Sequence, residues 1–69
     1  MAPLRIELDR EDDGRWIADI EALPGVLVYG ATREDAIAKV KVLALQVLAD
    51  KLAHGEQVPV TFDPFVVAA

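Results

Sequence analysis

Apolar and polar residues alternate along the N-terminal part of the chain with the two-residue period of β-strands. Residues 4–8 predict a half-buried strand, whose apolar side is formed by Leu4, Ile6 and Leu8. Residues 15–20 predict a second strand, whose main apolar side is formed by Trp16, Ala18 and Ile20. The charged residues between the two runs end in Gly14, as a hairpin connection does. The two runs therefore predict an antiparallel pair.

A corner separates the second strand from a third. Pro24 fixes its own φ angle and Gly25 tolerates a positive φ, so residues 21–25 predict a turn. Residues 26–29 are uniformly apolar, which leaves their two faces unassigned by alternation. We interpret them as the third strand of an antiparallel meander. Gly30 follows, and we expect it to give the backbone freedom at the corner that leads into a helix.

A long helix is predicted from Arg33 to His54. Thr32 is a good N-cap, because its hydroxyl can accept a hydrogen bond from an amide of the first turn. Asp35 completes a shortened capping box, and the acidic first turn suits the helix dipole. Gly55 is a natural stop at the C-terminal end.

The apolar surface of this helix is wider than one sheet can cover. Part of it follows a single helical line, formed by Ile37, Val40, Ala44 and Leu48. A second apolar group extends around the cylinder and is formed by Val42, Leu45, Ala49 and Leu52. We expect a second chain to cover this group. The alternative is that these side chains are simply tolerated at the surface.

The C-terminal segment has strand character at residues 58–62, where Pro59 suits an edge strand. The apolar tail, residues 63–69, is expected to dock on this subunit or on a neighbour. The fold class predicted is α+β, with the element order β-β-β-α-β. The predicted oligomer interface combines the second helical group with the tail and consists of Val42, Leu45, Ala49, Leu52, Phe65, Val66 and Val67.

Composition narrows the range of functions. The chain has 69 residues, 54% of them hydrophobic, and no cysteine; it is expected to be one domain without disulfides or thiolate metal sites. A domain of this size buries only about 60% of the surface that its unfolded chain exposes, which favours a homo-oligomer, a dimer or a tetramer. The net charge of −5 argues against binding to phosphate backbones. We expect no membrane span or signal peptide, and a cytoplasmic location.

Clustered carboxylates are the strongest candidates for chemistry. A divalent-metal nuclease using Glu7, Asp9 and Asp19 is one reading, but carboxylates on a solvated strand face and turn are the simpler one. His54, near the helix end, is interpreted as a group that suits the helix dipole rather than as a catalyst. We therefore predict no catalytic, cofactor-binding or metal-binding residue. The predicted contacts for a partner protein are Glu11, Asp12, Asp13 and Trp16.

The run DGRWIADIEALPGVLVYGATREDAIAKV resembles the signature of the HicB-type antitoxins. The likeness extends over residues 4 to about 60. It rests on the order and spacing of its short motifs: Asp13-Gly14 with Trp16, Ile17-Ala18-Asp19-Ile20, Leu23-Pro24-Gly25, Tyr29-Gly30, and Thr32 with Glu34, Asp35 and Ala36. Within the run, the residues that shape turns and the helix cap are Gly14, Pro24, Gly25, Gly30 and Thr32.

The resemblance implies a partial RNase-H-like fold without a nuclease site. It also implies a non-catalytic antitoxin that neutralises a HicA-type toxin, a small basic mRNA-cleaving protein, by binding over its active surface. Many HicB proteins carry a C-terminal DNA-binding segment, whereas this sequence stops at Ala69, so we expect no direct DNA binding. The alternative is a stand-alone structural or regulatory homo-oligomer without a toxin.

Overall fold

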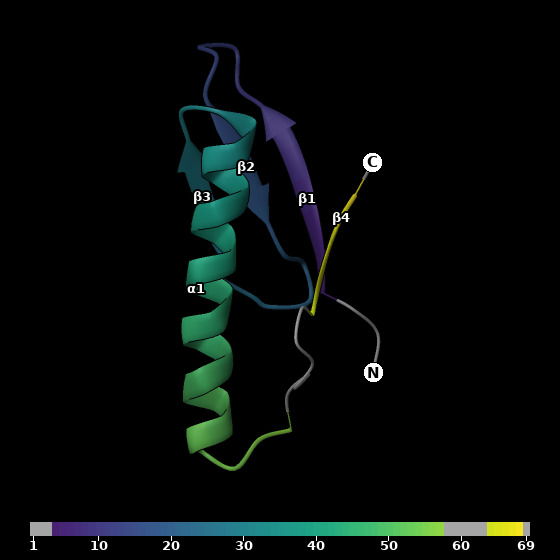
Figure 1. The fold of residues 1–69 in the computed structure, drawn as a ribbon, viewed down its shortest axis with the longest axis vertical. Coiled ribbons are helices and arrows are strands. Elements are labelled where there is room, and N and C mark those ends of the chain that lie inside the picture. The colour runs from purple at the N-terminus through teal and green to yellow at the C-terminus, as the bar shows by residue number, and fades with distance from the viewer. Residues whose placement is uncertain (1–3, 58–63, 69) are drawn as a thin grey trace.

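A computed structural model describes residues 4–57 and 64–68 (Figure 1). The chain forms a meander of three strands, one long helix and a short final strand, which confirms the predicted α+β class and element order. The elements are β1 (Leu4–Arg10), β2 (Trp16–Asp19), β3 (Leu27–Gly30), α1 (Arg33–Ala53) and β4 (Phe65–Val67).

The strands form one mixed sheet in the order β3-β2-β1-β4. β1 and β3 both pair antiparallel with β2, whereas β4 pairs parallel with β1. Helix α1 lies across one face of this sheet, mainly over β2 and β3 (Figure 1). Residues 4–57 and 64–68 therefore form two layers, and none of them places a helix on the opposite face of the sheet.

The core lies between α1 and the strand faces that the sequence pattern predicts. Ile6, Ala18 and Val40 have no exposed surface. The helix contributes one buried residue per turn, because residues four apart stack on one side of a helix. These residues are Ala36, Val40, Ala44 and Leu48. Two of them are alanines, whose short side chains let the helix lie close to the sheet.

Both ends of α1 are closed by hydrogen bonds of the predicted kind. The Thr32 hydroxyl accepts from the Asp35 amide at 3.0 Å, and the Asp35 carboxylate accepts from the Ala31 amide at 3.1 Å. At the other end Gly55 has φ +83°. Its amide and the next one donate to carbonyls of the last turn, which satisfies groups that have no partner within the helix. The helix ends at Ala53, one residue earlier than predicted.

Gly30 has a different role from the one predicted. Its φ angle is not positive, so the corner does not need the backbone freedom of glycine. A Cβ atom at this position would instead lie 2.4 Å from the Ala36 amide nitrogen. Gly30 is therefore required by the close approach of β3 to the first turn of α1.

The C-terminal tail docks on its own chain. β4 lies beside β1, and hydrogen bonds join the Leu4 amide to the Pro64 carbonyl at 2.6 Å and the Ala68 amide to the Ile6 carbonyl at 2.9 Å. Phe65 is half-buried and packs against the core, as does Val67. The strand predicted at residues 58–62 lies outside the described residues.

Candidate protein-binding face

The sheet face opposite α1 is uncovered within the described part of the chain. Strand geometry directs alternate side chains to this side, and the residues packed under the helix identify which ones face away from it. We call this surface the open face. It consists of Arg5, Glu7, Asp9, Ile17, Asp19, Leu27, Tyr29 and Val66.

Apolar side chains occupy the β2–β3 half of the open face. Leu27 is 50% exposed and Tyr29 is 44% exposed. Ile17 is the cross-strand partner of Tyr29, so the two side chains are neighbours on this surface. The Arg15 guanidinium stacks over the Tyr29 ring, 4.6 Å from its centroid. Exposed apolar side chains grouped with an aromatic ring and an arginine are typical of protein–protein contact surfaces.

Carboxylates occupy the β1–β2 part of the same face. Glu7 and Asp19 are direct cross-strand partners, and like charges opposite one another destabilise a sheet. Arg5 offsets part of this repulsion through an ion pair with Glu7 at 3.0 Å. Asp9 lies on the same side of β1, two residues beyond Glu7. A cationic group from a partner would relieve the remaining repulsion.

The structure separates the predicted partner contacts. Asp12 and Asp13 are exposed in the β1–β2 turn, with Glu11 at its start, whereas Trp16 is half-buried on the helix side of the sheet. Asp13 accepts hydrogen bonds from the Arg15 amide at 3.0 Å and from Arg15 Nε at 2.8 Å. These bonds lower the pKa of the Asp13 carboxyl below its ordinary value. Part of the acidic turn is thus bound within the chain.

His54, one of the candidates for chemistry, contacts the backbone of its own helix. His54 Nδ1 lies 2.7 Å from the Asp50 carbonyl oxygen, a contact that requires the ring nitrogen to donate. Among residues 4–57 and 64–68, no group of three or more acidic or histidine side chains is arranged to hold a metal ion. Glu7, Asp9 and Asp19 lie together on the open face.

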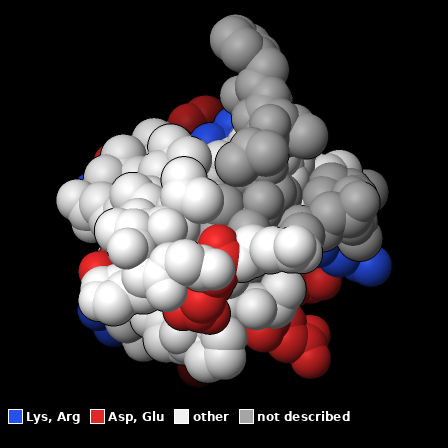
Figure 2. Space-filling view, turned by 90° about the horizontal axis from the view of Figure 1, so that it is seen from below, with Lys and Arg blue, Asp and Glu red and all other residues white. Residues whose placement is uncertain are grey.

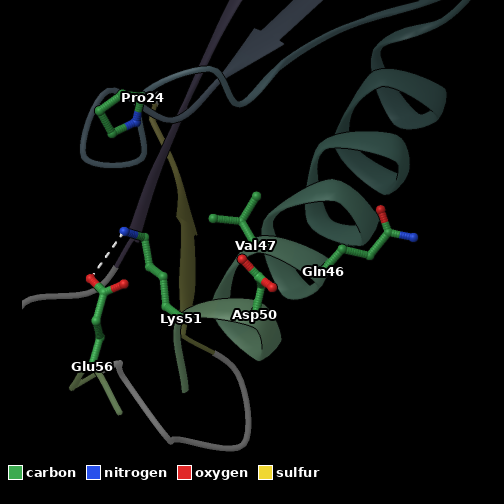
Figure 3. A pocket seen from close by; sticks show the side chains of 6 residues that line it. All are labelled: Pro24, Gln46, Val47, Asp50, Lys51 and Glu56. Atoms are coloured by element: carbon green, nitrogen blue, oxygen red, sulfur yellow. Dashed lines mark hydrogen bonds and ion pairs between the residues drawn. The ribbon is translucent and has the colours of Figure 1, made fainter. Parts of the chain in front are cut away.

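A hollow lies between the β2–β3 connection and the end of α1 (Figure 3). Its lining consists of Pro24, Gln46, Val47, Asp50, Lys51 and Glu56. Lys51 Nζ pairs with Glu56 Oε1 at 3.5 Å across one side of it. No polar side-chain atom among the described residues is buried without a hydrogen-bond partner. The hollow is lined by both apolar and charged side chains.

Sequence reasoning missed the apolar half of the open face. Residues 26–29 are uniformly apolar, so alternation alone gives no direction to Leu27 or Tyr29. The available signal was Ile17, an apolar residue on the otherwise polar side of the second strand. Ile17 pairs with Tyr29 across β2 and β3, so the two side chains belong to one apolar patch.

Comparison of the chain with family models, with curated proteins and with solved structures finds no significant match. The likeness to HicB-type antitoxins therefore rests on the sequence motifs. Within the described residues, no helix combines the length and the apolar character that crossing a membrane requires.

Proposed function

We propose that this chain is a non-catalytic protein-binding module that acts as a HicB-like antitoxin. In this proposal its partner is a small basic ribonuclease of the HicA type, which it neutralises by covering the active surface. The observation that carries the proposal is the open face, where the exposed apolar group of Leu27 and Tyr29 lies beside the carboxylates of Glu7 and Asp19.

The chemistry of the open face supports a basic partner. A ribonuclease must hold a polyanion, so its active surface carries cationic side chains. Such groups would replace the repulsion between Glu7 and Asp19 by ion pairs. The chain's net charge of −5 would speed encounter and help orient the two proteins. The apolar patch would supply the desolvated centre that protein interfaces require.

The test requires a candidate toxin of the HicA type, and the first candidate is any small basic protein encoded next to this chain. Co-expression should relieve the growth arrest that the basic protein causes, and the purified proteins should bind in calorimetry. Tyr29→Ala and Leu27→Ala should each weaken binding by about tenfold or more, as truncation of a central interface residue does. Raising the salt concentration should slow association, because steering by charge is screened.

Leu45→Ala is the matched control. Leu45 is 51% exposed, against 50% for Leu27, but it lies on α1 and away from the open face. The Leu45→Ala substitution should leave the affinity for the basic protein unchanged. The proposal is overturned if no basic neighbour binds, or if Leu27→Ala and Leu45→Ala weaken binding equally.

A further inference from the structure

The outward side of α1 carries an apolar stripe that the sheet does not use. We call it the outer seam; it consists of Ala38, Val42, Leu45, Ala49 and Leu52. All five residues are exposed, and the three largest, Val42, Leu45 and Leu52, are 57%, 51% and 55% exposed. In the end-on view of Figure 2, a broad uncharged area covers the side of the molecule on which α1 lies.

The spacing of the outer seam differs from that of the buried stripe. The buried residues recur every four positions, from Ala36 to Leu48. The outer seam recurs in steps of four, three, four and three, which is the repeat of helices that pack against another helix. Its members lie on the side of α1 away from the sheet. The complementary surface for such a stripe is therefore a second helix.

We propose that the outer seams of two copies of this chain pack together as an antiparallel helix pair, with Leu45 close to the two-fold axis. The seam is nearly symmetric about Leu45. Reversing the partner brings Val42 against the partner's Ala49, and Ala38 against the partner's Leu52. Each small residue then faces a large one, as close packing between helices requires.

Charge favours the same orientation. Lys39 lies six residues before Leu45 and Asp50 lies five residues after it, and the helical repeat places both on the same flank of the seam. In the antiparallel pair, each Lys39 therefore lies level with the partner's Asp50. A parallel pair would instead place the two Lys39 side chains on opposite sides of the pair, at a different level from the partner's Asp50, and would leave Ala38 facing Ala38. The helix dipoles also oppose one another favourably when the helices run antiparallel.

The small area of the outer seam means that dimerisation must be measured over a range of protein concentrations. Stable complexes bury at least about 1,200 Å² in total, and one short helix pair contributes less than this. The pair is therefore expected to form in a concentration-dependent way. Sedimentation over a concentration series should show the mass rising from 7.5 kDa towards twice that value.

Substitutions on the two apolar surfaces separate this inference from the proposed function. Leu45→Glu should keep the chain monomeric at all concentrations, because two carboxylates would meet near the axis. Leu27→Glu, at a position of equal exposure on the open face, should leave the dimer intact. Circular dichroism of both variants checks that the fold is retained. The inference is overturned if the chain stays monomeric throughout, or if Leu27→Glu dissociates the dimer and Leu45→Glu does not.

Cysteine cross-linking tests the orientation, since the chain has no cysteine of its own. Leu45→Cys should form an intermolecular disulfide under mild oxidation, whereas Asp12→Cys at the hairpin turn should not. A mixture of Ala38→Cys and Leu52→Cys chains should cross-link to each other in preference to themselves. Preferential Ala38→Cys homodimers would mean a parallel pair and would contradict the proposal.

Discussion

Gly30 shows that a glycine can be required by its neighbours rather than by its own backbone angles. It ends β3 where the chain turns into α1, and a Cβ atom there would lie 2.4 Å from the Ala36 nitrogen and 2.7 Å from its Cα. Gly25 is the opposite case, since it has φ +85° and no neighbouring atom within 4 Å of its added Cβ position. The two glycines therefore resist substitution for different reasons.

Gly30→Ala should lower the free energy of unfolding by about 1–3 kcal/mol, because the methyl group overpacks the contact between β3 and α1. Gly30→Asn should lower the free energy of unfolding by more than Gly30→Ala does, since the asparagine side chain is larger than that of alanine. Gly25→Asn should lower it by less than Gly30→Asn does, because asparagine tolerates the left-handed region and the site is open. Urea denaturation measures all three. A smaller loss for Gly30→Asn than for Gly25→Asn would show that β3 and α1 do not meet closely.

At the scale of elements, α1 is specified locally at both ends. Thr32 and Asp35 cap the first turn, and Gly55 closes the last, so short-range sequence signals located the helix to within a residue. The two faces of β3 were harder to predict, because an all-apolar run of four residues has no alternation that distinguishes them. Which side chains of β3 face the helix depends on its pairing with β2, a contact between segments separated by a turn.

The contribution of Asp35, in the first turn of α1, to the stability of the fold depends on pH. The Lys39 ammonium, which pairs with it at 3.0 Å, and the Ala31 amide lower the pKa of Asp35 below its ordinary value of 3.8. A carboxyl whose pKa is lower in the folded state stabilises the fold above the unfolded value. That contribution is lost as the pH falls through 3.8 and then through the lower folded value.

Asp35→Asn should therefore lower the free energy of unfolding at pH 7, and the deficit should shrink as the pH falls below 3.8 and the wild-type carboxyl becomes neutral, as the asparagine side chain already is. Thermal unfolding of both proteins across this pH range measures the difference. An equal deficit at both ends of the range would mean that the substitution acts through hydrogen-bond geometry or helix propensity and not through the charge.

At the scale of the whole molecule, β4 joins the two ends of the described chain. It completes the sheet by pairing parallel with β1, from Leu4 beside Phe65 to Ile6 beside Val67. Closing so long a loop costs conformational entropy before the strands can pair. The apolar tail offsets that cost by placing Phe65 and Val67 against the core.

Ala68→Pro tests this closure. Proline has no amide hydrogen, so the bond from the Ala68 amide to the Ile6 carbonyl, at 2.9 Å, is lost. The free energy of unfolding should fall by about 1 kcal/mol, and hydrogen exchange should speed up in β4 before it does in β2. Ala68→Gly keeps the donor and is the control. Equal exchange in β4 of the two variants would show that this bond does not hold the strand.

The sequence by itself determined the order of the elements, the buried faces of the first two strands and the capped helix, because each depends on residues close together in the chain. It also marked the second apolar group of α1, since helical spacing is local. Only the tertiary structure decided where the tail docks, why Gly30 is glycine and which apolar side chains share the open face with Glu7 and Asp19. Those features arise where segments distant in the sequence meet. The hydrophobic periodicity of a single helix or strand does not specify which other segment it contacts or how strong that contact is.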